Sequence, residues 1–132
     1  MIIFHKDGTL PQNGEVFVFG SNLAGIHGAG AAKVAAARFG MPYGFGKGWT
    51  HPFKAYAIPT KDRNINTIPL DEIRLYVDEF VQMTASDFIL NSGYFVTRVG
   101  CGLAGYKDEQ IAPMFKGAKN CSFAEEWRPY LT

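Results

Sequence analysis

The chain has 132 residues, of which 47% are hydrophobic and 19% are charged, and its formal net charge at neutral pH is +1. This length and composition are typical of one globular domain with a buried core, and the small net charge excludes the broad basic surface that binds long DNA or RNA. Neither cysteine belongs to a Cys-x-x-Cys pair, so we expect no metal site. Neither a signal-peptide pattern nor an apolar run of about 18 residues is present, so we expect a cytoplasmic protein with no membrane partner.

Strands and helices are predicted to alternate along the chain. Residues 2–4 and 15–19 are apolar runs rich in β-formers and predict strands, whereas residues 29–39 contain strong helix formers without a breaker and predict a helix. Residues 40–54 mix glycines with aromatic residues, which excludes a regular helix, and we expect a mobile loop there. The later predicted elements are a strand at 54–58 that ends at Pro59, a polar connection at 60–67, a helix at 68–85, strands at 88–90 and 93–99 separated by a turn, a helix at 108–116 and a strand at 121–124.

This alternation, without an internal repeat or a linker, predicts a single α/β domain over residues 1–132. We expect a three-layer α/β/α sandwich with a mixed or mostly parallel sheet whose helices cover both faces. In such sheets ligands usually bind beyond the carboxyl ends of the strands. Loops that directly follow strands are therefore the first candidates for a site.

Residues 20–33, between the predicted strand at 15–19 and the predicted helix at 29–39, form a polar, glycine-rich turn. Gly28 and Gly30 can adopt positive φ angles and let a ligand approach the main chain closely. The first turn of the following helix adds unpaired N–H groups and the positive end of the helix dipole. The turn therefore predicts a site for an anion such as phosphate. The same glycines are also compatible with tight turns between packed elements.

A second glycine cluster, residues 100–106, again lies between a predicted strand and a predicted helix. Because both clusters follow strands, they could converge on one ligand. Cys101 has no cation nearby in the sequence to activate it, which favours a small buried apolar residue over a nucleophile. Tyr106 can pack on a sugar or a base, or it can belong to the core.

Asn22, followed by spaced glycines and an alanine-rich helix, resembles the first ligand loop of macro domains, in which an asparagine precedes a run of glycines. The turn Gly-Leu-Ala-Gly-Tyr at residues 102–106 is similar to the second loop of that family, a Gly-x-x-Gly-aromatic turn that wraps a diphosphate. With the preceding cysteine, it resembles the branch of the family that has a Gly-Cys-Gly-Leu second loop. The order and spacing of the two loops agree, and the resemblance covers roughly residues 7–118.

The resemblance implies a macro-domain-like fold with a pocket for ADP-ribose. The second loop would embrace the diphosphate, the first loop would flank the distal ribose, and Asp7 would accept a hydrogen bond from the adenine amino group. The ligand-binding residues implied in this way are Asp7, Ser21, Asn22, Gly28, Ala29, Gly30, Gly100, Cys101, Gly102, Leu103, Ala104, Gly105 and Tyr106. Phe45 could also pack on the ligand, but Phe45, Trp49 and Phe53 could equally cover a neighbouring helix.

Some macro domains only bind ADP-ribose, and others remove it from proteins or from small esters. In the branch with the Gly-Cys-Gly-Leu loop, a lysine after the central strand can attack the ribose, helped by an aspartate directly after the leucine. Lys61 matches that lysine, whereas Ala104 occupies the place of the aspartate and Asp108 lies four residues further on. A different catalytic hypothesis is a water oriented by Asn22 and His27, because histidine titrates near neutral pH.

Simpler interpretations of these residues stay open. Asn22 could form an Asx-turn or cap the next segment, and Asp7 could be a turn residue. His27 and Lys61 could be solvated loop residues.

Two classes of function remain. The leading prediction is binding of ADP-ribose or a related adenine diphosphate nucleotide, with or without hydrolysis, and with an ADP-ribosylated protein as a candidate partner. The alternative is a non-catalytic protein that sequesters another nucleotide signal, such as a cyclic ADP-ribose derivative, or that binds a protein partner. Neither requires a cofactor. The sequence has no GxxxxGK[ST] loop and no GxSxG elbow, which argues against other α/β hydrolases.

Overall fold

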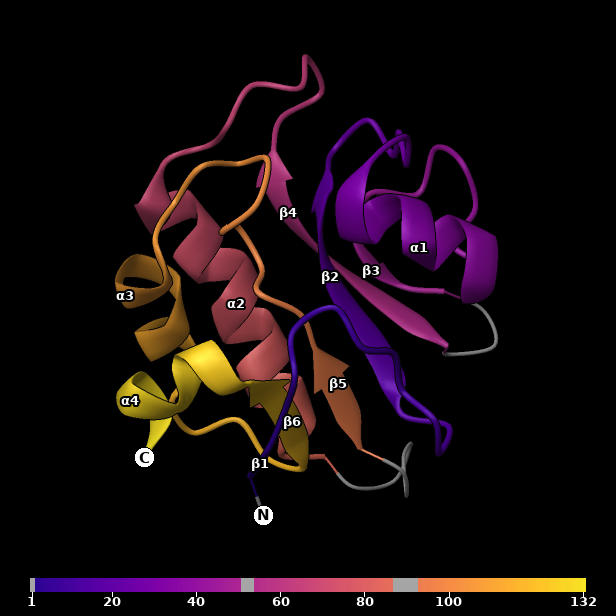
Figure 1. The fold of residues 1–132 in the computed structure, drawn as a ribbon. Helices are drawn as coiled ribbons and strands as arrows, with labels where there is room; N and C mark the ends of the chain where they lie inside the picture. Colours follow the sequence, from indigo (N-terminus) through magenta and orange to yellow (C-terminus); the bar gives the residue numbers. More distant parts are fainter. Residues whose placement is uncertain (1, 51–53, 87–92) are drawn as a thin grey trace.

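The computed structural model describes residues 2–50, 54–86 and 93–132, and in these residues the strands form one mixed sheet (Figure 1). The sheet has six strands in the order β1-β6-β5-β2-β4-β3. The strands are β1 (Ile3–His5), β2 (Val16–Asn22), β3 (Gly48–Trp49), β4 (Ala55–Lys61), β5 (Tyr94–Val96) and β6 (Cys121–Ala124). Every neighbouring pair is parallel except β3 and β4, which are antiparallel. The carboxyl ends of the parallel strands therefore lie along one edge of the sheet.

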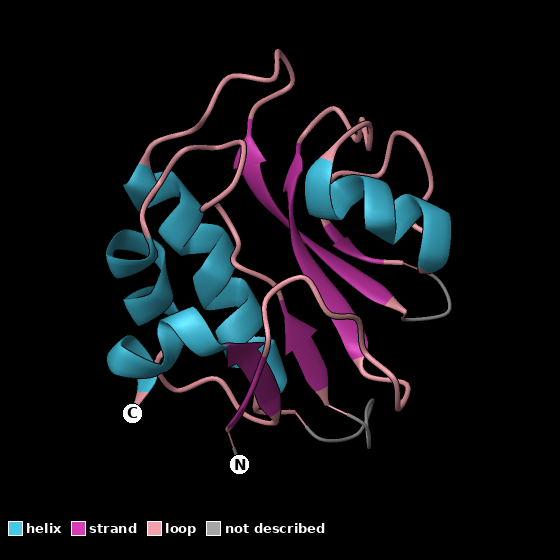
Figure 2. Ribbon diagram, viewed as in Figure 1, coloured by secondary structure: helices cyan, strands magenta, loops and turns pink. Residues whose placement is uncertain are grey.

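Helices cover both faces of this sheet (Figure 2). They are α1 (Gly30–Arg38), α2 (Leu70–Thr84), α3 (Asp108–Ile111), η1 (Ala112–Phe115), η2 (Glu125–Trp127) and α4 (Arg128–Leu131). Helix α1 contacts β2 on one side, and α2 contacts β4 and η1 on the other. No helix among the described residues has the length and hydropathy needed to cross a membrane.

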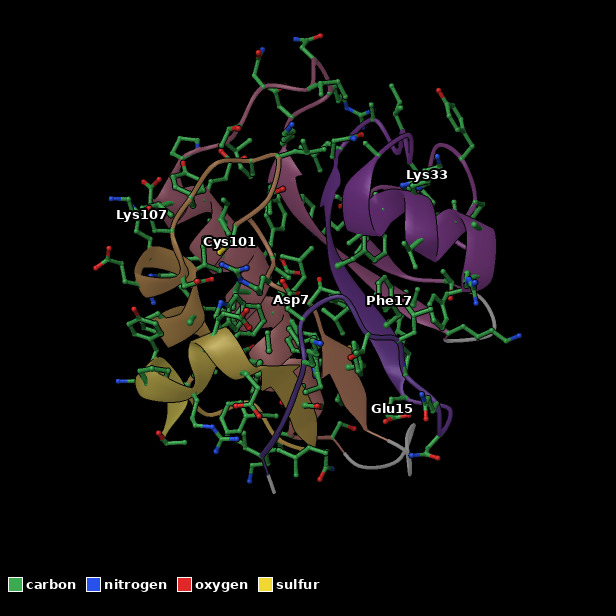
Figure 3. The ribbon with its side chains drawn as sticks, in the orientation of Figure 1. Asp7, Glu15, Phe17, Lys33, Cys101 and Lys107 are labelled. Atoms are coloured by element: carbon green, nitrogen blue, oxygen red, sulfur yellow. The ribbon has the colours of Figure 1, made fainter. Side chains whose placement is uncertain are left out.

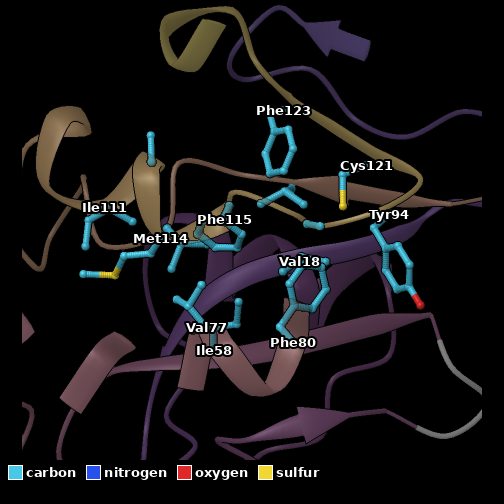
Figure 4. Packing of buried hydrophobic residues seen from close by; sticks show 14 of the residues in the cluster. Val18, Ile58, Val77, Phe80, Tyr94, Ile111, Met114, Phe115, Cys121 and Phe123 are labelled. Carbon is cyan, nitrogen blue, oxygen red and sulfur yellow. The ribbon is translucent and has the colours of Figure 1, made fainter. Parts of the chain in front are cut away.

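The two faces of β2 explain why its sequence is apolar at almost every position. Val16 and Val18 belong to the larger core cluster, which packs against α2 and includes Phe80 (Figure 4). Phe17 and Phe19 alternate with them and belong to a smaller cluster that includes the alanines of α1. A central parallel strand that is buried on both faces reads as a continuous hydrophobic run. The mixed α/β fold predicted from the sequence is thus confirmed.

The predicted helices at 29–39 and 68–85 correspond to α1 and α2, and the predicted strand at 121–124 is β6. The predicted strand at 93–99 is limited to β5, and the predicted helix at 108–116 divides into α3 and η1. Pro113 has no N–H to continue the α-helical bonding pattern, which accounts for this division. The predicted strand at 88–90, the turn after it and Phe53 lie outside the described residues.

Two predicted strand ends are wrong. Strand β2 continues past Phe19 through Asn22, so the first glycine-rich loop begins later than predicted. Strand β4 continues through Pro59 to Lys61. Within the described residues β3 pairs with β4 only at Tyr56 and Ala57, so no described strand pairs with the outer edge of β4 at the proline. The missing N–H of proline then disrupts no ladder bond on that edge.

Candidate functional site

A cavity of about 630 Å³ lies at the carboxyl ends of the parallel strands and is lined by residues that follow β1, β2, β4 and β5. Figure 3 shows Asp7, Phe17 and Cys101, three of its lining residues, which come from distant parts of the chain. The predicted site residues that line it are Asp7, Ser21, Asn22, Gly28, Ala29, Gly30, Lys61, Gly100, Cys101, Gly102, Leu103 and Ala104. The location agrees with the general rule for ligand sites in parallel sheets.

The side chain of Asn22, the last residue of β2, holds the first turn of the loop that follows. Its Nδ2 donates to the carbonyl of Ile26 at 2.8 Å, and its Oδ1 accepts from the Ile26 N–H at 3.0 Å. The turn-forming interpretation of Asn22 is therefore correct as a structural role. Asn22 also lines the cavity, and its amide keeps one donor and one acceptor site beyond these two bonds.

Residues 44–46 form the base on which this loop rests. The Gly44 N–H donates to the Gly25 carbonyl at 2.9 Å, and Ser21 Oγ donates to the Gly46 carbonyl. A Cβ at Gly46 would lie 2.1 Å from the Asn22 carbonyl oxygen, so only glycine permits this approach. None of the described residues between 40 and 50 lines the cavity, so they provide no lid over it. Phe45 and Trp49 therefore lie away from the cavity wall.

The N-terminus of α1 forms one wall of the cavity. Gly28, Ala29 and Gly30 line it, and no side chain of the described residues caps the first turn of the helix. The first N–H groups of an α-helix have no intrahelical acceptor, and they carry the positive end of the helix dipole. This wall therefore offers main-chain donors to an anionic group.

The second loop forms the opposite wall. It is closed by hydrogen bonds from Tyr106 N to the Gly100 carbonyl at 2.9 Å and from Gly105 N to the Gly102 carbonyl at 3.1 Å. Gly100 and Gly105 have positive φ angles of 76° and 88°, which favour glycine. The N–H groups of residues 102–104 donate to no backbone acceptor among the described residues. Successive free N–H groups in such a turn suit an anion.

The two loops approach each other closely. A Cβ built on Gly30, at the start of α1, would lie 3.9 Å from Leu103 Cδ1, and one on Gly20, inside β2, would lie 3.4 Å from the Gly100 nitrogen. Two segments that are distant in sequence therefore come close together and line the same cavity.

His27, Gly105 and Tyr106 are predicted site residues that the structure does not bring to the cavity wall. His27 is buried, with Nε2 3.0 Å from the Pro42 carbonyl and its ring edge-on to Phe19. The Tyr106 hydroxyl donates to the Ile68 carbonyl at 2.7 Å, and its ring packs on the larger core cluster. The core interpretation of Tyr106 is therefore correct, and a catalytic role for His27 has no geometric support.

Arg98 links two acidic residues next to the cavity. Its Nε and Nη2 donate to Asp108 Oδ1 and Oδ2 at 2.9 and 2.7 Å, and its Nη1 lies 3.2 Å from Asp7 Oδ2. Hydrogen bonding to Asp108 raises the pKa of the Arg98 guanidinium well above its usual range, so the group stays charged. Asp7 is thus part of an ion-pair network, and one of its carboxylate oxygens has no partner among the described residues.

Asp108 is fully engaged in this network. Burial acts to raise the pKa of its carboxyl, but hydrogen bonds from Arg98, Trp127 and Cys101 outweigh burial and leave the pKa below its ordinary value. Asp108 does not line the cavity. It therefore does not replace the aspartate whose place Ala104 occupies.

The Cys101 thiol lines the cavity but is not activated. Burial, with a smaller contribution from the negative charge of Asp108, raises its pKa to about 12. A thiol with this pKa is almost fully protonated at neutral pH and is a poor nucleophile. This agrees with the interpretation of Cys101 as a small packing residue.

His5 and Arg98 are cavity residues that the sequence analysis did not select. The His5 ring stacks on Phe95 with centroids 3.8 Å apart, and Nδ1 lies 2.7 Å from Ser122 Oγ. Burial lowers the pKa of His5, despite opposing contributions led by Asp7. His5 could have been found from its position directly after the first predicted strand. No sequence signal pairs Arg98 with its acidic partners.

Lys61 ends β4, where its carbonyl accepts from the Leu23 N–H at 2.9 Å. Lys61 lines the cavity, and its side chain forms no ion pair among the described residues. Asp7 is the one carboxylate among the described lining residues. The described residues also contain no group of three or more His, Cys, Asp or Glu side chains that could hold a metal ion.

Comparisons with protein-family models, with curated proteins and with solved structures find no match for this chain.

Proposed function

We propose that the protein binds ADP-ribose, or a related adenine diphosphate nucleotide, in the cavity at the strand ends. The observation that carries this proposal is the pair of donor walls, the uncapped start of α1 and the N–H groups of residues 102–104, on one cavity. Main-chain donors on two walls of one cavity suit a diphosphate, which carries charge on both phosphoryl groups. A cavity of about 630 Å³ is also within the usual size for sites of small nucleotides.

The orientation of the ligand follows from the polar groups at each end. The second loop would hold the diphosphate, and the first loop would place Asn22 beside the distal ribose. Asp7 would accept a hydrogen bond from the adenine amino group through the carboxylate oxygen that Arg98 does not use. The His5 ring, stacked on Phe95, supplies a flat aromatic surface near Asp7 at the same end.

The arrangement of the sheet, the two main helices and the cavity is compatible with this proposal. A mixed sheet with α1 on one face, α2 on the other and a cavity at the carboxyl ends is what a macro-domain-like sandwich requires. We therefore include the macro-domain-like fold in the proposal.

Binding without turnover is the form that the side chains favour. Ala104 has no carboxylate, Asp108 is held by Arg98 and Trp127, and His27 lies away from the cavity. A second candidate function, removal of ADP-ribose from a modified substrate, is supported by Lys61, which lines the cavity and forms no ion pair among the described residues. Incubation of wild type and Lys61→Ala with an ADP-ribosylated protein separates the two candidates. Turnover that Lys61→Ala abolishes supports the second, and no turnover supports binding alone.

Calorimetric titration with ADP-ribose, AMP and cyclic ADP-ribose tests the proposal. We expect ADP-ribose to bind more tightly than AMP, and no heat with any of the three would overturn the proposal. Gly102→Val is the informative variant, because a Cβ at Gly102 meets no atom within 4 Å and its backbone φ is not positive. The variant should fold, yet its side chain would occupy the space proposed for the diphosphate and abolish binding. Ala37→Val, on the exposed side of α1 and outside the cavity, is the matched control.

A further inference from the structure

Three large apolar side chains at the cavity are exposed, namely Ile26, Ile65 and Leu103, which are 39%, 40% and 70% accessible. Each comes from a different loop, after β2, after β4 and after β5 respectively. Single exposed apolar residues are common on protein surfaces, but several around one cavity mark a contact surface. We call these three residues the apolar rim.

Hydrogen bonds hold the three loops of the apolar rim together. The Leu23 N–H donates to the Lys61 carbonyl at 2.9 Å, which joins the first loop to the end of β4. Thr67 Oγ1 donates to the Ala104 carbonyl at 3.0 Å, which joins the turn after β4 to the second loop. The three loops that carry the apolar rim are therefore joined to one another, and Asn22 and Lys61 line the same cavity.

Ile65 has a backbone conformation that its side chain disfavours. Its φ angle is +65°, in the left-handed region that a β-branched residue rarely adopts. The turn is already specified by Asp62, whose Oδ1 accepts from the N–H groups of Asn64 and Asn66 at 2.8 and 3.0 Å. Glycine or asparagine would suit this position better. The isoleucine side chain therefore serves a purpose other than the turn, since it is exposed and strained.

We propose that the apolar rim is a subsite for an apolar or aromatic group attached to the distal ribose of the bound nucleotide. This inference rests on the proposed function, which places the distal ribose beside Asn22. A group bonded to that ribose would leave the cavity between the first loop, the turn after β4 and the second loop. It would there cover the side chains of Ile26, Ile65 and Leu103. The apolar rim thus recognises the part of a modified substrate that ADP-ribose alone lacks.

The test compares two ligands by calorimetry on the whole chain: ADP-ribose, and an analogue with a phenyl group on the 1″ carbon through a thioether, which resists hydrolysis. We expect the wild-type protein to bind the phenyl analogue about fivefold to tenfold more tightly, as burial of a few tens of Å² of apolar surface predicts. Ile65→Gly and Ile65→Asn should lose this preference while their affinity for ADP-ribose is unchanged. Both variants should also unfold at the same or a higher temperature than wild type, because they suit a positive φ. Leu75→Ala, which removes an exposed apolar side chain of α2 away from the cavity, should keep the preference.

Each outcome has one meaning. Equal affinities of wild type for the two ligands, or a preference that survives in Ile65→Gly, overturns the inference and leaves the proposed function intact. Absence of binding to ADP-ribose overturns the proposed function and this inference with it. A lower unfolding temperature of both Ile65 variants, with the preference unchanged, assigns Ile65 to the fold alone and also overturns the inference.

Discussion

Asp7 and Arg98 are 91 residues apart in the sequence, yet Arg98 Nη1 lies 3.2 Å from Asp7 Oδ2. The ion pair joins the segment after β1 to the segment after β5, and both residues line the cavity. Arg98 holds Asp108 at the same time, at the start of α3. One guanidinium thus fixes three segments around the end of the cavity where we place adenine.

Arg98→Ala is expected to lower both stability and affinity for ADP-ribose. The variant removes three hydrogen bonds to carboxylates and leaves Asp108 partly buried without its cation, so we expect a loss of about 2 kcal/mol in the free energy of unfolding. Arg98→Lys keeps the positive charge but lacks the planar guanidinium that contacts both carboxylates. Its stability and its affinity for ADP-ribose should therefore lie between those of wild type and Arg98→Ala. Urea denaturation and calorimetric titration measure the two effects.

Glu79→Gln, which breaks the exposed pair with Lys47, should change stability by no more than about 0.5 kcal/mol. An Arg98→Ala protein as stable as this control would contradict the network.

The stability of the protein should fall at acidic pH because of Asp108. The folded-state pKa of this carboxyl lies below the unfolded value, so the unfolded chain takes up the proton more readily. The contribution of Asp108 is therefore complete above the unfolded pKa, about 3.9, and is lost as the pH falls through the folded pKa. Urea unfolding measured from pH 6 to pH 2.5 should show this decline. Asp108→Asn should be less stable at pH 6 and show a shallower decline, and parallel curves for the two proteins would rule out this assignment.

How far the sequence predicts this molecule depends on the range of the interaction. The continuous apolar run of β2 and the single apolar face of α2 are local patterns, and both elements were predicted correctly in type. The position of the two glycine-rich loops follows from the strand-end rule, which is why most predicted site residues line the cavity. Pro59 lies inside a strand because its neighbour β3 is short, and no local pattern contains that information.

Side-chain directions in the loops were less predictable. Nothing in the sequence around His27 indicates that its ring turns towards Phe19 and Pro42 rather than the cavity. The Arg98 network joins residues from three segments and depends on the complete fold. The macro-domain resemblance predicted a role for Asp7 but gave no indication of its cationic partner.

Cys101 should be chemically inert although it lines the cavity. With a pKa of about 12, only about one thiol in ten thousand is ionised at pH 8, compared with roughly a quarter for an ordinary cysteine. We expect iodoacetamide to modify the folded protein at least about a hundredfold more slowly than a cysteine-containing peptide. Intact-mass measurements over time give the rate, and the protein unfolded in guanidinium should react as fast as the peptide. Rapid modification of Cys101 in the folded state would instead identify an activated thiol.

Gly46→Ala should destabilise the first loop through steric overlap and not through backbone strain. The φ angle of Gly46 is not in the positive region, so alanine introduces no backbone strain, but its Cβ would lie 2.1 Å from the Asn22 carbonyl oxygen and 3.1 Å from Gly25 N. Main-chain atoms must move to relieve this overlap, and we expect a loss of at least about 2 kcal/mol in stability together with weaker binding of ADP-ribose. Gly28→Ala is the matched control, because a Cβ there meets no atom within 4 Å and its φ is also not positive. Thermal unfolding of both variants, and titration of Gly46→Ala and wild type with ADP-ribose, test the point. A Gly46→Ala protein with the stability of Gly28→Ala would mean that residues 44–46 do not support the loop that contains Asn22.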